Sequence, residues 1–308
     1  MNCESYTISE LLTLTSSATI CKSSFTHCNA DGAIFCNDSN LDFACSTTEF
    51  YDCASLERKR GGAMCLYVKT ANLHYICAIT CYAERYGVTY TQIYSDLNVY
   101  FFTAAYCWKN NISSATALHL SPYNTSTIQY VNNSHENVNW GMLDLTAASP
   151  TEKTNVLYSQ FKNCTSDRLG YWDDSCDDLL ILKRNNFIGN TFTTAFAYLL
   201  RNRTYFDSDI FYLNRNSTGQ LSIYFQKYGS IPGSAYLTGC YTDAPESTVS
   251  EEMTCDSSCK FNHTGNPRPK PALNTGMCDA ETITGVLRPF HPESILSVCF
   301  FSHYSLIV

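Results

Sequence analysis

The sequence predicts a mostly β fold that is secreted, glycosylated and cross-linked by disulfides. Aromatic and β-branched residues recur in strand-length runs between turn-forming residues. The 308-residue chain has 17 cysteines, more than a protein of the reducing cytosol ordinarily carries. It also has eight Asn-x-Ser/Thr sequons, at Asn37, Asn111, Asn124, Asn132, Asn163, Asn202, Asn216 and Asn262.

The stretch from 197 to 226 is densest in β-forming residues. Its segment 204–213 is rich in Tyr, Phe and Ile, and the apolar segment 221–225 follows after a polar turn at 214–219. We expect a β-hairpin, with one sequon before its first strand and another at its turn. Without further information, such a hairpin would be a structural element with no direct role.

Strand patterns also occur in 64–82 and 87–108, where Val, Ile, Tyr and Phe are frequent. The segment from Tyr90 to Ala105 fits a helix as well, because Ile93, Leu97 and Tyr100 follow at helical intervals. Residues 1–60 carry five cysteines spaced seven to nine residues apart, from Cys21 to Cys53, without a repeat between them. We expect disulfide-stapled loops there, and a helix beginning near 279.

Charge argues against nucleic acid as a partner, since 28 acidic and 20 basic residues give a net charge of −8. The cluster 58–60 is the longest basic run, and we interpret it as a solvated turn. No run of about 18 apolar residues appears, so the sequence predicts no membrane anchor within this chain. The start lacks the pattern of a signal peptide, which suggests that the chain was cut from a longer one.

Catalytic and metal-binding motifs were not found. The sequence has no Gly-x-Ser-x-Gly elbow, no His-Glu-x-x-His and no P-loop. Four aspartates between 173 and 178 do not have the spacing of a calcium-binding EF-hand loop. We therefore expect no metal and no cofactor.

Six segments in the same order carry a resemblance to a known family. YTQIYSDLNVY (90–100) and NRTYFDSDIFYLNRNSTG (202–219) are the strongest, and 20–43, 66–77, 254–264 and 279–304 are weaker. They resemble the hemagglutinin-esterases of coronaviruses and toroviruses, relatives of the influenza C hemagglutinin-esterase-fusion protein. The resemblance covers most of the chain, but identity between these segments is low.

The resemblance implies an α/β SGNH-type esterase domain with an inserted jelly-roll lectin domain. The esterase would occupy 1–105 and 246–308 and the lectin 106–245. It further implies a virion envelope protein that reaches the cell surface through the secretory pathway and binds O-acetylated sialoglycans on host cells. A disulfide between Cys3 and Cys21 would follow, and a homodimer is one option for the assembly.

The catalytic groups of the family are not matched. The nucleophilic serine would lie before Met1, and the positions of the triad aspartate and histidine hold Asn274 and Met277. A methionine cannot take a proton from a serine, and an asparagine cannot stabilise an imidazolium as a carboxylate does. Only Asn72 matches a group of the oxyanion hole. The sequence therefore predicts an inactive esterase.

The resemblance places the sialic acid site at Leu199, Leu200, Arg201 and Asn202, where an apolar wall adjoins polar groups. A glycan on Asn202 would obstruct this surface. The alternative function is a non-catalytic viral attachment glycoprotein, for instance a spike subunit, whose likeness to the esterases is compositional.

Overall fold

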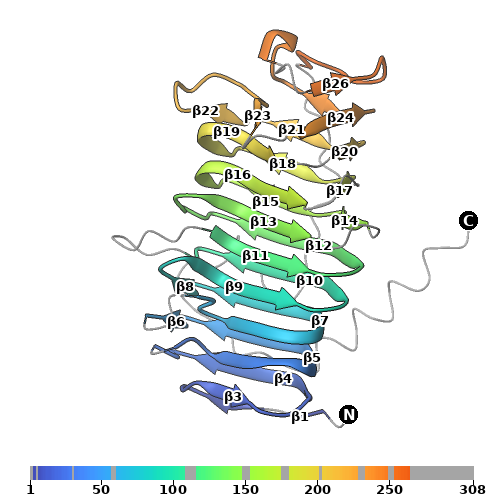
Figure 1. Ribbon diagram of the computed structural model, residues 1–308. Coiled ribbons are helices and arrows are strands. Elements are labelled where there is room, and N and C mark those ends of the chain that lie inside the picture. The colour runs from blue at the N-terminus through green and yellow to red at the C-terminus, as the bar shows by residue number, and fades with distance from the viewer. Residues whose placement is uncertain are drawn as a thin grey trace, which may run out of the picture.

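Strands of the computed structural model pair in parallel with the next coil of the chain, and the coils stack into a β-solenoid (Figure 1). The structure describes residues 3–4, 6–29, 31–56, 60–107, 116–147, 153–174, 180–200, 203–227, 233–248 and 253–263. In these residues every ladder between strands is parallel, and the one helix is the 3-10 turn η1 (Glu246–Thr248). The predicted α/β esterase with an inserted jelly roll is therefore wrong.

Each coil contributes to three faces, called A, B and C in chain order. Phe50 pairs with Ala78 and Phe161 with Phe187, so one coil takes 28 residues in the first case and 26 in the second. Face A contains β3 (Leu12–Leu14), β9 (Tyr86–Ile93), β11 (Thr116–Pro122), β13 (Gly141–Ala147), β16 (Thr165–Asp174), β19 (Thr191–Leu200), β22 (Arg215–Asn216) and β23 (Phe225–Lys227).

Face B follows face A through connections of varying length. It contains β1 (Cys3–Glu4), β14 (Thr154–Leu157), β17 (Leu180–Lys183), β20 (Arg203–Asp207), β24 (Ser234–Thr238) and β26 (Met253–Cys255). Face C contains β2 (Thr7–Ile8), β15 (Gln160–Lys162), β18 (Asn186–Ile188), β21 (Ile210–Tyr212) and β25 (Tyr241–Thr242).

Longer strands join these faces. β4 (Ala18–Thr26), β10 (Leu97–Ala105) and β12 (Ser126–Ser134) bend from face B into face C, while β5 (Ile34–Tyr51) and β7 (Met64–Ile79) run through all three. A separate small pair consists of β6 (Ala54–Ser55) and β8 (Tyr82–Ala83).

The corners of the solenoid are made by single residues in the left-handed backbone region. Between faces B and C these include Tyr75, Phe101 and Tyr130, with φ of 55°, 56° and 59°. A side chain in this conformation costs roughly 1 kcal/mol. The rings offset part of that cost by stacking coil over coil, with centroids 4.7 Å apart from Tyr75 to Phe101 and again from Phe101 to Tyr130. We call these three residues and Tyr158 the corner stack.

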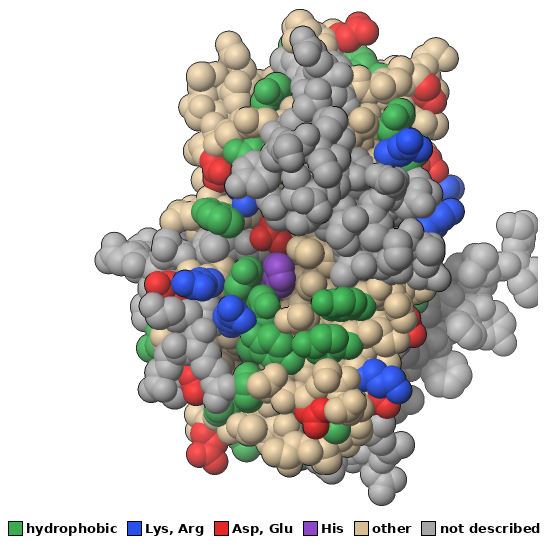
Figure 2. Space-filling view, in the orientation of Figure 1, with side chains coloured by type: hydrophobic (Ala, Val, Ile, Leu, Met, Phe, Trp, Pro, Cys, Tyr) green, Lys and Arg blue, Asp and Glu red, His purple; other side chains and the backbone are tan. Residues whose placement is uncertain are grey.

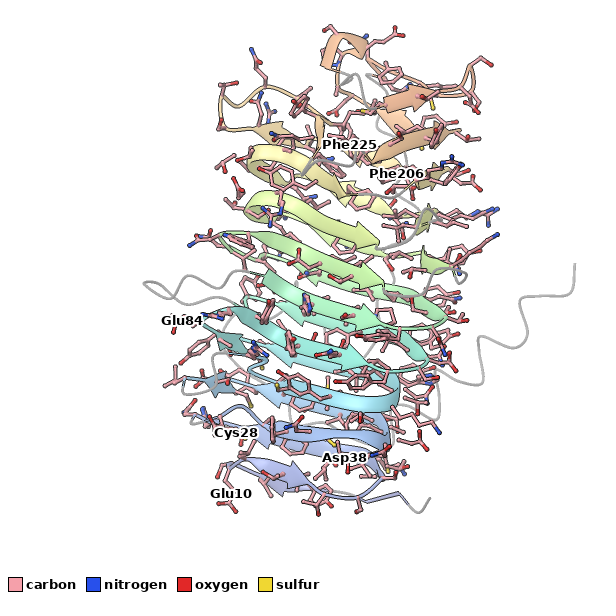
Figure 3. The ribbon with its side chains drawn as sticks, viewed as in Figure 1. Glu10, Cys28, Asp38, Glu84, Phe206 and Phe225 are labelled. Carbon is pink, nitrogen blue, oxygen red and sulfur yellow. The ribbon has the colours of Figure 1, made fainter. Side chains whose placement is uncertain are left out.

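Inward side chains of successive coils also stack and form the core. Phe161, Phe187 and Phe211 pair in register on face C, with ring centroids 5.3 and 5.1 Å apart. Phe206 and Phe225 point toward one another inside the upper coils (Figure 3), with centroids 5.3 Å apart. The alternation of inward apolar and outward polar residues is what period-2 strands require.

Most described cysteines are part of this interior. Cys28, Cys53, Cys81 and Cys107 each follow the corner between faces C and A, and all are buried reduced thiols. We call these four the thiol column. Cys21 and Cys77 are disulfide-bonded. The predicted disulfide-rich framework is therefore wrong for the described part, because a buried cysteine packs as a small apolar residue.

Glu136 occupies the next position of that corner column and is 2% exposed. Burial raises its pKa well above the usual range, with Cys107 adding to the effect. Its folded-state pKa thus exceeds the unfolded value of about 4.3, so the folded state binds this proton more tightly than the unfolded state does. The resulting contribution to the free energy of unfolding is complete below about pH 4 and is lost as the pH rises through the folded pKa.

We expect Glu136→Gln to be more stable than the wild type near pH 8 but not near pH 4. Urea unfolding midpoints at the two pH values measure this. Glu246→Gln, at an exposed carboxylate of η1, is the matched control. Equal pH slopes for wild type and Glu136→Gln would contradict a buried, proton-holding Glu136.

The secondary structure predicted for the first 108 residues is partly confirmed. The strands within 64–82 and 87–108 are confirmed as β7, β9 and β10, and the helical alternative for Tyr90–Ala105 is wrong. The loop prediction for 1–60 is also wrong, since β4 and β5 lie there. The predicted helix near 279 lies outside the described residues.

The predicted hairpin is wrong too. β20 pairs with β17 and β24, and β21 pairs with β18 and β25, all in parallel. What remains is a tight turn in which Gly219 N donates to Asn216 O over 2.9 Å, beside an isolated antiparallel bridge from Arg215 to Leu221.

The expected domain boundary at 105 falls between β10 and β11. Strands on its two sides pair directly, β10 with β12 and β9 with β11.

Candidate functional site

The outer side of face A brings polar and aromatic residues of successive coils together. Tyr90 pairs in register with His119, and His119 pairs with Asp144. Leu118 and Leu120 point into the core, so His119 between them points outward. In a parallel ladder, side chains on the same side lie one coil above another, and these three therefore form a column.

We define the aromatic face as the outer side chains of Arg60, Tyr67, Tyr86, Tyr90 and His119. The rings of Tyr90 and His119 are stacked, with centroids 4.9 Å apart and an angle of 4°. Tyr86 lies 4.6 Å from each of them, and Tyr67 lies 5.4 Å from Tyr90. Figure 2 shows hydrophobic side chains gathered around a histidine on the face in view, with basic and acidic side chains beside them.

Arg60 places a cation over one of these rings. Its Cζ atom lies 4.7 Å from the centroid of the Tyr90 ring, and its guanidinium donates to the Tyr67 hydroxyl. A guanidinium over an aromatic face is attracted by the ring quadrupole. The loop position of Arg60 follows from the bridge that pairs it with Tyr86.

Burial sets the protonation of the aromatic face. It raises the pKa of Tyr86 and of Tyr90, so both phenols stay neutral at pH 7. Burial, and secondly Arg60, lowers the pKa of His119 to about 4. His119 is therefore neutral as well, and its buried Nδ1 has no hydrogen-bond partner. The aromatic face thus combines neutral polar rings with the positive charge of Arg60.

A second arginine continues this surface along face A. The Cζ atom of Arg168 lies 4.9 Å from the ring of Trp140 and 4.5 Å from that of Tyr198. The carboxylate of Asp144 lies next to Gly141. A Cβ atom added to residue 141 would stand 2.7 Å from Asp144 Oδ1. A glycine at 141 therefore makes room for the Asp144 side chain.

The corner stack differs from the aromatic face in the angles between neighbouring rings. Its rings lie nearly parallel, at 1°, 12° and 18°, so each ring covers the face of the next. In the aromatic face, Tyr67 and Tyr86 are tilted by 52° and 44° against Tyr90. Tilted pairs are ordinary aromatic packing; what distinguishes the aromatic face is that phenol and imidazole groups and a guanidinium lie together on it, a mixture that ligand sites use.

Of the predicted site residues, the structure describes Asn72, Leu199 and Leu200. Asn72 lies on the outside of β7, where its Oδ1 accepts from Asn98 Nδ2 over 3.0 Å. Leu199 and Leu200 end β19, directly after Tyr198. Four positions lie outside the described residues: Arg201, Asn202, Asn274 and Met277.

Described sequons lie at accessible positions. Asn37, Asn124, Asn163 and Asn262 are exposed, and Asn132 and Asn216 are half-buried. Asn163 and Asn262 have φ of 54° and 51°, so both occupy turns. Asn111 and Asn202 lie outside the described residues. The described acceptors are thus compatible with glycan attachment.

Sequence reasoning missed the aromatic face. It interpreted Arg60 as part of a solvated turn. The usable signal is the coil length, because Tyr90, His119 and Asp144 follow at steps of 29 and 25 residues. That step becomes visible only once the pairing is known.

Comparison with protein-family models, curated proteins and solved structures finds no match to this chain. Among the described residues, no group of three or more His, Cys, Asp or Glu side chains is arranged to hold a metal ion. None of the helices in the described part has the length and apolar character needed to cross a bilayer. The fold and the aromatic face therefore carry the functional argument.

Proposed function

We propose that this chain is an extracellular attachment protein that binds acidic glycans through the aromatic face, without catalysis. One observation carries the proposal: the rings of Tyr67, Tyr86, Tyr90 and His119 meet on the outer side of a parallel sheet, with the Arg60 guanidinium over the Tyr90 ring. Such a surface offers a sugar both an apolar wall and placed hydrogen-bonding groups.

The chemistry of each group fits a charged sugar. Aromatic rings pack against the C–H faces of a pyranose, while the phenol hydroxyls exchange hydrogen bonds with sugar hydroxyls. An arginine pairs with a carboxylate through parallel N–H donors. Arg60 thus selects an acidic sugar, and sialic acid with its O-acetylated forms is the ligand class that we favour.

Exposed sequons support the extracellular part of the proposal. Glycans on Asn37, Asn124, Asn163 or Asn262 would require passage through the secretory pathway. A virion envelope or a cell surface is the location that we propose. The interior thiols do not bear on this, because they are shielded from solvent in the folded chain.

Titration of sialyllactose and of lactose, its uncharged counterpart, tests the proposal. Tyr67→Ala and Arg60→Ala should each weaken sialyllactose binding by about tenfold or more, which corresponds to about 1.4 kcal/mol. Arg60→Ala should also remove the preference for sialyllactose over lactose.

Two control variants match these in chemistry. Tyr123→Ala removes a tyrosine that stacks on Tyr94 at 5.5 Å, and Arg184→Ala removes an arginine 5.8 Å over Tyr158 of the corner stack. Both should bind as the wild type does. Equal losses in the controls, or unchanged binding by Tyr67→Ala and Arg60→Ala, would contradict the proposal.

A further inference from the structure

Two cysteines at the end of the described solenoid lie in register. Lys260 N donates to Cys240 O over 2.9 Å, and Thr242 N donates to Lys260 O over 2.9 Å. An isolated parallel bridge pairs Tyr241 with Lys260, so Cys259 stacks on Cys240 as the corresponding residue of the next coil. Neighbouring parallel strands lie about 4.8 Å apart, which is within the Cα separation that a disulfide spans.

The two thiols are in contact but differ in access. Cys240 is 2% exposed, and its Sγ donates to Phe206 O and Thr238 O, each over 3.5 Å. Cys259 is half-buried, and its Sγ donates to Leu237 O over 3.3 Å. A reagent in solution can therefore reach Cys259 first, with Cys240 directly behind it.

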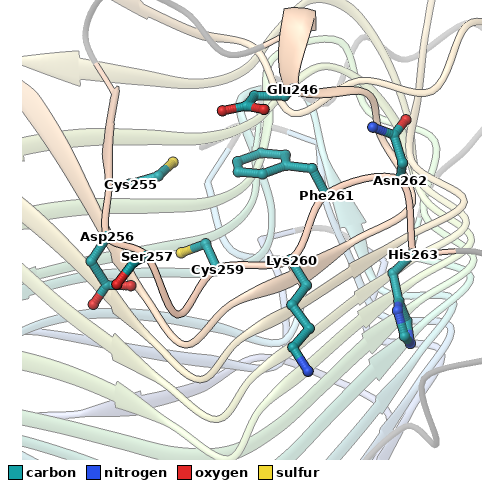
Figure 4. Close-up of a pocket in the computed structure, with 9 residues that line it drawn as sticks. All are labelled: Glu246, Cys255, Asp256, Ser257, Cys259, Lys260, Phe261, Asn262 and His263. Atoms are coloured by element: carbon teal, nitrogen blue, oxygen red, sulfur yellow. The ribbon is translucent and has the colours of Figure 1, made fainter.

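Cys259 lines a pocket of about 690 Å³ together with Lys260 and His263. Figure 4 shows Cys255 and Cys259 on the two arms of the loop that Asp256 and Ser257 close. A hydrogen bond from Cys240 lowers the pKa of Cys259, which favours its thiolate form. The thiolate is the form that attacks a disulfide.

The thiol column differs from this pair in access. Its thiols also contact one another, and hydrogen bonds from Cys28 and Cys81 lower the pKa of Cys53 as well. Cys53, Cys81 and Cys107 are 0% exposed, so no dissolved disulfide reaches them in the folded chain. The pair at the end of the solenoid is therefore a different kind of site from the structural thiols inside it.

We propose that Cys240 and Cys259 are a redox site that closes as a disulfide and fastens the terminal coil to the solenoid. The oxidant is a small disulfide such as oxidised glutathione. The Cys259 thiolate attacks one of its sulfurs and releases one thiolate, which leaves a mixed disulfide on Cys259. Cys240 then loses its proton and attacks Cys259 Sγ, releasing the second thiol. One disulfide forms in the protein and one small disulfide becomes two thiols.

The consequence lies at the last coil that the structure describes. β26 pairs with β24, and the segment carrying Cys259 is held to face C by isolated backbone bonds rather than by a long ladder. A segment held by so few backbone bonds opens locally at low free energy. A covalent link from Cys259 to Cys240 would hold the segment in place.

The experiment uses the full chain, fully reduced and then equilibrated with oxidised and reduced glutathione. Remaining thiols are blocked with iodoacetamide, and peptides are mapped by mass spectrometry. We expect a Cys240–Cys259 link, with Cys53, Cys81 and Cys107 blocked only after denaturation. Amide exchange in 253–263 should slow by about tenfold on oxidation.

Variants separate this link from others. Cys255→Ser should keep both the link and the slower exchange, whereas Cys240→Ser and Cys259→Ser should lose both. A Cys255–Cys259 link, glutathione that stays bound to wild-type Cys259, or no link in a sample with the native circular dichroism spectrum would overturn the proposal.

Discussion

Phe187→Ala is expected to lower the free energy of unfolding by about 3 to 5 kcal/mol. Phe187 is 1% exposed and contacts rings of the coils on both sides, Phe161 at 5.3 Å and Phe211 at 5.1 Å. Phe196 meets it edge-on at 5.3 Å. Truncation would leave a cavity shared by three coils, and a stacked solenoid cannot close that cavity without shifting its register.

Urea unfolding followed by circular dichroism measures this loss. The matched control is Tyr224→Ala, because Tyr224 is an aromatic residue that is 41% exposed, and we expect a change within about 0.5 kcal/mol. A Phe187→Ala protein as stable as the control would mean that face C is not packed coil over coil.

Asn190→Ala is expected to lower the free energy of unfolding by about 2 to 4 kcal/mol. Asn190 is 2% exposed; its Nδ2 donates to Phe161 O over 3.0 Å, and its Oδ1 accepts from Cys164 N over 3.0 Å. It also donates to Asn214 Oδ1 over 3.0 Å. Alanine would leave two buried backbone groups of the preceding coil, Phe161 O and Cys164 N, without the Asn190 side chain as partner, and each such group costs about 1 to 3 kcal/mol.

Asn98→Ala is the control for this change. Asn98 and Asn72 form a similar amide pair between coils, at 3.0 Å, but on the outside of the solenoid. Water replaces the lost bond there, so we expect a loss below about 1 kcal/mol in the same urea assay. Equal losses for the two variants would argue against the buried hydrogen bonds that Asn190 makes between coils.

Local structure was predictable from the sequence where strands are long. The pattern of 64–82 indicated a strand, and β7 covers most of it. The partners of the strands were not predictable, since the alternation of a strand does not say whether its neighbour is the next segment or one coil away. Segment 204–213 shows this. The polar turn that follows it at 214–219 favoured a hairpin, but its strands pair with strands of other coils.

Cysteine use misled the prediction for a physical reason. A high cysteine count is typical of small secreted domains held by disulfides, whereas this solenoid buries one cysteine per coil at the same corner, where each packs as a small apolar side chain. The aromatic face escaped for a related reason. Arg60, Tyr90 and His119 are far apart in the chain and become neighbours only through the parallel register.

The measurement that tests the account most directly is binding of the full wild-type chain to an array of paired sialylated and desialylated glycans, with O-acetylated sialosides included and acetate release followed in the same samples. We expect binding to the sialylated member of each pair and no acetate release, because the Arg60 guanidinium over the Tyr90 ring selects the carboxylate. Equal binding to both members, release of acetate, or no binding by a folded sample would contradict the account.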